Sequence, residues 1–338
     1  MKHLMMLSLA LLLSIALGAG ELFIYNWTGY TSEEMLEKFT QETGIRVILD
    51  TFDSNETLLA RLQSGATGYD IVVPTHNFVQ IFVEEGLLEP INAMELENFG
   101  NIDPRWQNPD WDPGNVYTVP WNWGSTSFNV DTDVYDGDLS SFRVLFDPPE
   151  ELQGRIGMLD SWDENIPMAL RFLGYDSCET NPQAFSEVLA LLEAQRPHVR
   201  MYNSEGVVEN VIAGEVAMHT HWNGASLRAR RDRPSIVYAY PVEGVSGWMD
   251  NLAVARNAPN KENALIFINW FLQPENAALQ SNFAGYANGV LGSEEFLLED
   301  LRTAPEVVPP ADAVVDFAPT CPPEYVDLAS RVWTRLRQ

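Results

Sequence analysis

The stretch LFIYNWTGY, residues 22–30, places a short apolar run directly before a group of aromatic and polar side chains. An apolar run such as 22–25, closed by a turn-forming residue, is typical of a buried strand. Trp27, Thr28 and Tyr30 follow at the end of this strand. Ligands of open α/β sheets bind outside the carboxyl ends of strands, and binding pockets are largely lined by aromatic rings. The stretch therefore predicts part of a ligand site, with core packing of Trp27 and Tyr30 as the alternative.

Strand and helix patterns alternate along the rest of the chain. The capping box TSEE at 31–34 predicts a first helix, which Gly44 would end. Further strands are expected at 45–49, 69–73, 125–130, 156–159, 215–219, 235–240 and 251–255, and further helices at 54–64, 166–173, 185–193, 206–213, 262–271, 275–282 and 325–336. This alternation predicts an α/β fold with a mostly parallel sheet. The Trp- and Pro-rich stretch 101–125 is expected to be either a crossing between two lobes or a long surface loop.

Length and composition indicate a globular, exported protein. The chain has 338 residues, enough for two domains, and its formal net charge is −28. Residues 1–20 combine a short positive start, an apolar run and small residues, which is the pattern of a secretory signal peptide. The expected location is a bacterial periplasm. The negative charge excludes nucleic acid as a partner and suits either a cationic ligand or a strongly solvated surface.

Cysteine and histidine usage leaves two questions open. Cys178 and Cys321 are the two cysteines, and an oxidising compartment makes a disulfide between them plausible. His219 and His221 alternate on a predicted strand, so their rings point to one face. A metal site normally needs three or more protein ligands, and no third one is identified. We therefore expect no metal and no cofactor.

Aromatic and acidic residues recur at the ends of predicted strands in both halves of the chain. They are Trp27, Tyr30, Trp162, Glu164, Trp222, Trp248 and Asp250. Such a set predicts a cleft between two lobes that is suited to an organic cation, because ring faces and carboxylates both attract ammonium groups. A glycosidase is the enzyme alternative, with Asp160, Asp163, Glu164 and Asp250 as candidate acids. No nucleophile motif or phosphate loop is present, so we do not expect an enzyme.

With these residues assembled, the mature chain resembles the periplasmic spermidine/putrescine-binding proteins of bacterial ABC importers. The resemblance rests on YNWTGY at 25–30, TFDSNETLLARL at 51–62, YDIVVPT at 69–75, MALRFLGY at 168–175, GEVAMHTHWNG at 214–224, GWMDNLAV at 247–254 and AGYANGV at 284–290. It implies a type II solute-binding protein, a monomer whose two α/β lobes close over the ligand and then dock on a membrane permease. The implied lobes are 21–125 with 251–295, and 126–250 with 296–338. Both cysteines then fall in the second lobe, which favours the disulfide.

The resemblance also implies roles for individual residues. The ligand wall falls on Trp27, Thr28, Tyr30 and Thr75, the amine-binding acids on Glu164 and Asp250, and the rings around the methylene chain on Trp222, Trp248 and Tyr286. Asn77, Ser161, Trp162 and Asp163 are further candidates. Gly29 and Ser161 stand where an acid is usual, Asn77 replaces an aromatic, and Ala225 lacks an Asp of some putrescine binders. Either Asp163 or water substitutes for the missing acids, or the ligand carries a single amine and a different far end.

Overall fold

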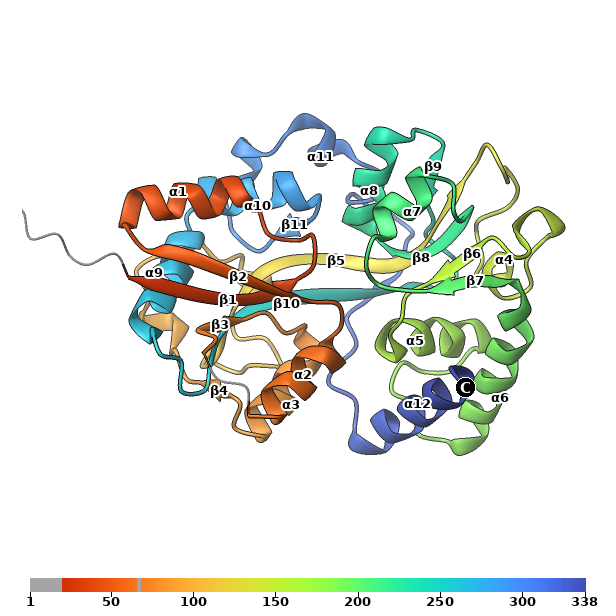
Figure 1. The fold of residues 1–338 in the computed structure, drawn as a ribbon, viewed down its shortest axis with the longest axis horizontal. Coiled ribbons are helices and arrows are strands. Elements are labelled where there is room, and N and C mark those ends of the chain that lie inside the picture. The colour runs from red at the N-terminus through yellow and green to blue at the C-terminus, as the bar shows by residue number, and fades with distance from the viewer. Residues whose placement is uncertain (1–19, 66–67) are drawn as a thin grey trace, which may run out of the picture.

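The computed structural model describes residues 20–65 and 68–338, and these residues form one sheet of 12 strands with helices on both faces (Figure 1). The main path of the sheet runs through β2 (Arg46–Phe52), β1 (Glu21–Trp27), β3 (Ile71–Val72), β10 (Val245–Ala255), β5 (Thr118–Asp131), β8 (Met218–Trp222), β6 (Ile156–Met158) and β7 (Val199–Tyr202). Off this path, β4 (Leu88–Glu89) and β12 (Val315–Asp316) pair with β10, and β9 (Ile236–Tyr238) and β11 (Ala287–Asn288) pair with β5.

Most parallel pairing lies at the two ends of the sheet, and one further parallel pair joins β12 to β10. Strands β2, β1 and β3 are mutually parallel, and so are β8, β6 and β7. Between them, β10 and β5 run antiparallel to each other and extend from one side of the molecule to the other (Figure 1). We call the part built on β1–β3 the first half and the part built on β6–β8 the second half. The predicted α/β fold with a mixed sheet is confirmed; among the described strands, six pairs are antiparallel and five are parallel.

The helices lie on the faces of these two parts. They are α1 (Glu33–Thr43), α2 (Asn55–Gln63), α3 (His76–Glu84), α4 (Arg143–Phe146), α5 (Trp162–Leu173), α6 (Pro182–Gln195), α7 (Val207–Ile212), α8 (Asn223–Asp232), α9 (Lys261–Phe271), α10 (Pro274–Ala284), α11 (Glu299–Thr303) and α12 (Pro323–Leu336). Short 3₁₀ turns occupy Ala93–Glu95, Phe99–Asn101, Pro104–Trp106, Glu150–Leu152, Arg196–His198 and Ser293–Phe296. The Trp- and Pro-rich stretch is irregular up to 117 and then continues as β5, which crosses between the halves.

Several element boundaries differ from the sequence-based expectation: β5 begins at Thr118 rather than 125, and β8 spans Met218–Trp222 rather than 215–219. Strand β7 and helices α3 and α8 lie where no element was expected. Three further differences concern α1, α5 and β10. The first helix is capped by Ser32 rather than Thr31, because the Ser32 hydroxyl accepts the N–H of Met35 at 3.2 Å. Helix α5 begins at Trp162 instead of 166, so the acids that follow it form a first helical turn, where negative charge is favoured. Strand β10 begins six residues early, at Val245.

The early start of β10 depends on a close approach at Gly247. A Cβ atom on this residue would lie 2.7 Å from a ring carbon of Phe317. Glycine inside a strand often marks such an approach of another chain segment. The C-terminal segment can therefore run along β10, where Val245 pairs with Val315. As a result, Trp248 and Asp250 lie within a strand rather than before one.

The hydrophobic core shows that the two halves are in contact. Leu22, Phe39 and Trp121 belong to a buried cluster within the first half. A second cluster joins Phe78 of the first half to Trp162 of the second half, with ring centroids 6.0 Å apart. A shared apolar cluster of this kind shows that the two halves pack against each other.

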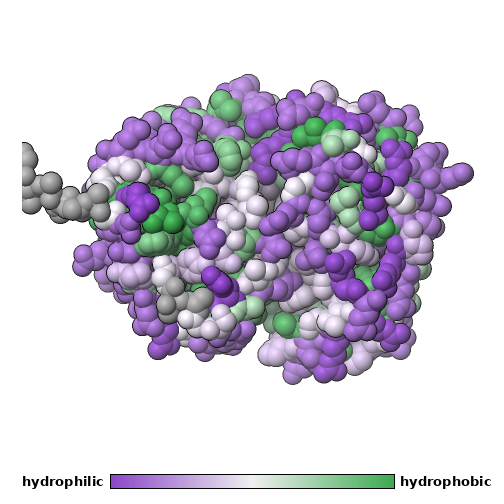
Figure 2. Space-filling model, in the orientation of Figure 1, coloured by the Kyte–Doolittle hydropathy of each residue, from purple (hydrophilic) through white to green (hydrophobic). Residues whose placement is uncertain are grey.

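The surface is largely hydrophilic on the face shown in Figure 2, in keeping with the excess of acidic residues. None of the helices that the structure describes combines the length and apolar character needed to cross a bilayer. The predicted signal peptide at 1–20 lies outside the described residues apart from Gly20.

Candidate ligand-binding site

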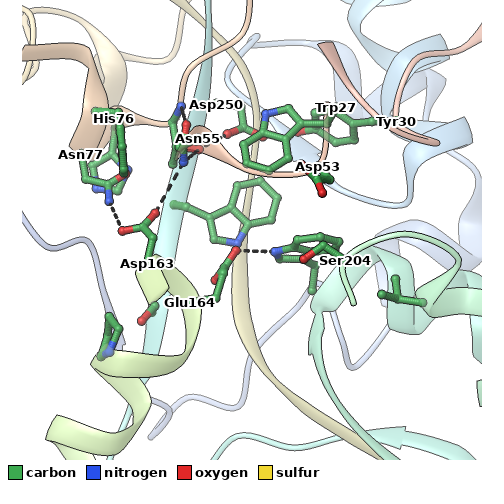
Figure 3. A pocket seen from close by; sticks show the side chains of 18 of the residues that line it. Trp27, Tyr30, Asp53, Asn55, His76, Asn77, Asp163, Glu164, Ser204 and Asp250 are labelled. Carbon is green, nitrogen blue, oxygen red and sulfur yellow. Dashed lines mark hydrogen bonds between the residues drawn. The ribbon is translucent and has the colours of Figure 1, made fainter. Parts of the chain in front are cut away.

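A cavity of about 690 Å³ lies between the two halves. Every residue predicted to bind ligand lines it, and so do three of the four further candidates; these residues are Trp27, Thr28, Tyr30, Thr75, Asn77, Trp162, Asp163, Glu164, Trp222, Trp248, Asp250 and Tyr286 (Figure 3). Ser161, the fourth further candidate, is not among the lining residues. These wall residues come from the end of β1 and the turn after it, the start of α3, the first turn of α5, the end of β8, the middle of β10, and the turn between α10 and β11.

Asp250 is held at the centre of the cleft by a break in strand register. The pairing of β10 with β5 shifts between Met249 and Asn251, which turns the intervening residue out of the regular ladder. Its Oδ1 atom accepts the hydroxyl of Thr75 at 2.7 Å. The side chain is buried, and burial raises the pKa of Asp250 from its ordinary value of 3.8 to about 7.

Glu164 is the second carboxylate of the site. It lies in the first turn of α5, and its Oε1 atom accepts the indole N–H of Trp222 at 2.6 Å. Burial raises the pKa of Glu164 to about 7. The hydrogen bond fixes Trp222, which ends β8 and stands directly before α8. One acid and one ring are therefore positioned together from adjacent elements of the second half.

The remaining rings are anchored by their polar atoms. The indole N–H of Trp27 donates to the carbonyl of Val73 at 3.0 Å, and that of Trp248 donates to the hydroxyl of Thr126 at 3.1 Å. Trp27 comes within 6.3 Å of Trp222 across the cleft, measured between ring centroids. Anchored rings lose little further conformational freedom when a ligand arrives, which reduces the cost of binding.

Tyr286 completes the aromatic wall and depends on a glycine. Its ring lies 5.1 Å from Trp248 and 5.4 Å from Tyr30. The hydroxyl of Tyr286 accepts the N–H of Ala225 at 3.2 Å. A Cβ atom on Gly224 would lie 2.4 Å from the tyrosine ring. Only glycine at 224 lets the start of α8 approach the ring this closely.

Asp163 faces the side-chain amides of Asn77 and Asn55, of which sequence reasoning had identified only Asn77. Its Oδ1 accepts the side-chain N–H of Asn77 at 2.8 Å, and its Oδ2 lies 3.5 Å from the side-chain nitrogen of Asn55. Asn55 also donates to Thr75 Oγ1 at 3.0 Å, and Asp53 and Ser204 line the same cavity (Figure 3). The signal for Asn55 and Asp53 was present, since DSN at 53–55 follows β2 directly, as Thr28 follows β1.

The cleft carboxylates have no positive partner among the described residues. None of the ion pairs found in the described parts of the chain includes Asp163, Glu164 or Asp250. The two arginines that line the cavity have partners other than these three carboxylates. Arg171 pairs with Asp316, and Arg228 lies over the ring of Tyr286. Burial of unpaired carboxylates is costly, so the site favours a cation.

The two histidines and two cysteines have structural surroundings. The rings of His219 and His221 are 5.6 Å apart on one face of β8, as predicted, and burial lowers the pKa values of His219 to about 4 and of His221 to about 3. The described residues contain no group of three or more candidate metal ligands. Cys178 and Cys321 form a disulfide with their Cα atoms 5.2 Å apart, as the resemblance implied.

The fold and this cleft place the chain in a known class. The sequence model of bacterial extracellular solute-binding proteins matches residues 34–307, and the chain belongs to that family. Among its relatives is the spermidine/putrescine-binding periplasmic protein of Escherichia coli K12, 36% identical over 295 residues, which cover 87% of this chain and 84% of that protein. The putrescine/agmatine-binding protein of Pseudomonas aeruginosa is 30% identical over 100% of this chain and 99% of its own length.

A solved structure supports the same fold. The putative spermidine/putrescine ABC transporter structure from Listeria monocytogenes superposes with a TM-score of 0.89. It is 27% identical and covers 95% of this chain and 99% of that chain. The overall architecture of this chain is therefore the one expected for a type II solute-binding protein.

Proposed function

We propose that this protein captures a polyamine of the putrescine/spermidine class in the cleft and delivers it to the permease of an ABC importer. The single observation that carries the proposal is the pair of unpaired carboxylates, the buried Asp250 and the half-buried Glu164, among anchored rings. The named relatives from E. coli and P. aeruginosa bind such amines. Their agreement with the chemistry of the site supports the assignment.

The energetics are sufficient for binding in the micromolar range. A micromolar complex needs about 8 kcal/mol of net binding free energy. Each hydrogen bond from an ammonium group to a carboxylate contributes about 1.5–3 kcal/mol, and each ring face about 0.5–2 kcal/mol. The entropic cost of association subtracts several kcal/mol from this gross sum. Two carboxylates and four or five rings give a gross sum of about 5–16 kcal/mol, and the upper part of this range meets the requirement once the cost is subtracted.

The proposed roles follow from position. Asp250 and Glu164 hold an ammonium group, and Trp222 and Trp248 flank the methylene chain. Trp27, Thr28, Tyr30, Thr75 and Tyr286 form the remaining wall. A far amine group has Asp163 or water as its partner, because Gly29 and Ser161 bring no acid to the cleft. A ligand with a single amine is the second candidate, and those two positions favour it.

The remaining parts of the proposal concern the movement of the lobes, export, oligomeric state and the absence of catalysis. We propose that 21–125 with 251–295 and 126–250 with 296–338 move as two lobes, with β5 and β10 as the connecting segments. We further propose export through the signal peptide at 1–20, action as a monomer, and no catalytic activity. Membership of a family of transport proteins supports the last point.

Calorimetric titration tests the proposal. Putrescine, cadaverine, spermidine, spermine and 4-aminobutyrate are titrated into protein that has been unfolded, dialysed and refolded to remove co-purified ligand. We expect saturable binding of at least one diamine or polyamine. No heat with any of them refutes the proposal, and binding of 4-aminobutyrate alone selects the single-amine candidate. Turnover of a chromogenic glycoside panel would instead support the enzyme alternative.

A further inference from the structure

Three side chains of the first half reach across the cleft to the start of α5 in the second half. The hydroxyl of Ser161 donates to Glu56 Oε1 at 2.9 Å. Asn77 donates to Asp163 Oδ1 at 2.8 Å, and Asn55 lies 3.5 Å from Asp163 Oδ2. We call these five residues the clasp. Asn55 and Glu56 are the first two residues of α2, and Asn77 is the second residue of α3, so three helix starts converge at the clasp.

Part of the clasp lies away from the ligand cavity. Glu56 and Ser161 are not among the residues that line it, and Ser161 is buried. The hydrogen bond between them therefore joins the two halves without presenting either group to a ligand. Helix α5 receives no side-chain hydrogen bond from its own N-cap residue, Ser161. The carboxylate of Glu56, supplied from the opposite half, lies beside this helix start, where negative charge is favourable.

The other part of the clasp is connected to the amine-binding acid through one hydroxyl group. Thr75 Oγ1 accepts from Asn55 at 3.0 Å and donates to Asp250 Oδ1 at 2.7 Å. The same side-chain nitrogen of Asn55 faces Asp163. A continuous set of hydrogen bonds thus runs from Asp250 through Thr75 and Asn55 to the second half. The geometry that orients Asp250 for a ligand is the geometry that forms the clasp.

We propose that the clasp sets ligand affinity by holding the cleft closed, and that Asp163, Ser161 and Asn77 act through closure rather than as partners of the ligand's amine groups. The inference rests on the proposed function, in which the ligand is held between the halves. Oδ1 of Asp163 accepts from Asn77 and Oδ2 lies 3.5 Å from the amide nitrogen of Asn55, so part of the accepting capacity of this carboxylate is used within the clasp. A group that acts through closure changes the affinity for every ligand by the same factor, because its interaction is made with the protein alone.

The test uses residues that do not touch the cavity. Glu56→Ala, Ser161→Ala and the double variant are titrated with putrescine and spermidine, beside the control Glu85→Ala, whose carboxylate bonds Gln63 within the first half. Loss of a hydrogen bond to a charged group should weaken binding by about 10- to 150-fold. We expect the same factor for both ligands, a double variant no weaker than the weaker single variant, and an unchanged ligand-free melting temperature.

Three results would overturn the clasp. They are unchanged affinity, a factor that differs between putrescine and spermidine, and strictly additive effects in the double variant. A ligand-independent measurement accompanies them. Cysteines introduced by Glu56→Cys and Ser161→Cys should be joined by a short bifunctional thiol reagent, whereas Glu85→Cys with Ser161→Cys should not. Failure to join the first pair refutes the clasp even if no amine binds, and joining without amine binding refutes only the proposed ligand.

Discussion

Replacing Asp250 by Asn should weaken ligand binding and stabilise the ligand-free protein at the same time. In the wild type the hydroxyl of Thr75 donates to the Asp250 carboxylate at 2.7 Å. The side-chain oxygen of Asn can accept the same hydrogen bond, so the local structure is retained. The substitution removes only the charge. A charge-assisted hydrogen bond is worth about 1.5–3 kcal/mol, which corresponds to a loss of affinity of about 10- to 150-fold.

The stabilisation follows from the pKa of the buried acid. Burial raises the pKa of Asp250 from 3.8 to about 7 in the folded protein. The unfolded chain ionises near the ordinary value, so folding loses stability as pH rises from about 4 toward 7. The difference between these two pKa values corresponds to about 4 kcal/mol as an upper limit at neutral pH. Asp250→Asn escapes this penalty, and its ligand-free melting temperature should exceed that of the wild type at pH 7–8.

The two assays are calorimetric titration with putrescine and thermal unfolding without ligand, each at pH 7.5. Glu209→Gln is the matched control, because this acid lines the same cavity but is exposed. The control should change affinity by less than about threefold, since exposed charges are screened by solvent. Affinity of Asp250→Asn within threefold of the wild type would show that Asp250 holds no amine. A lower ligand-free melting temperature would show that the acid stabilises the fold instead.

Three further predictions concern protons, the disulfide and the far end of the ligand. Asp250 and Glu164 have pKa values of about 7 without ligand. Binding of an amine that pairs with both should therefore release about one proton at pH 7, and the affinity should rise from pH 5 to 8. Binding heats that do not depend on the ionisation enthalpy of the buffer would contradict this prediction. The Cys178–Cys321 disulfide joins residues 143 positions apart, so its reduction should lower the free energy of unfolding by up to about 5 kcal/mol. The denaturant midpoint should therefore be lower with reductant than without it. An unchanged midpoint would show that the disulfide does not stabilise the fold. Gly29→Asp adds a carboxylate to the cavity wall at a position where a Cβ meets no atom within 4 Å and where the φ of +65° is one that Asp tolerates. The variant should bind spermidine in preference to putrescine more strongly than the wild type does in competition titrations. An unchanged ratio of the two affinities would show that position 29 does not face the far amine.

Local sequence patterns predicted much of the site because the relevant signal is short-range. A buried strand followed by NWT places side chains at one edge of a parallel sheet, whatever the rest of the chain does. Trp27 and Thr28 were found in this way, and both line the cavity. The disulfide and the individual roles of Trp222 and Asp250 came from resemblance to a family, since no local pattern reports which distant residues meet.

The sequence by itself determined the α/β class, the aromatic and acidic composition of the cleft and the candidate residues on its walls, because side-chain periodicity and turn chemistry are properties of neighbouring residues. The tertiary structure decided what those residues do to one another. Ser161 turned away from the cavity toward Glu56, and Asp163 met amides of Asn55 and Asn77, although each pair is separated by more than 80 positions in the chain. Such pairings depend on how two halves of a sheet close, and closure is fixed by packing across the cleft rather than by any local pattern.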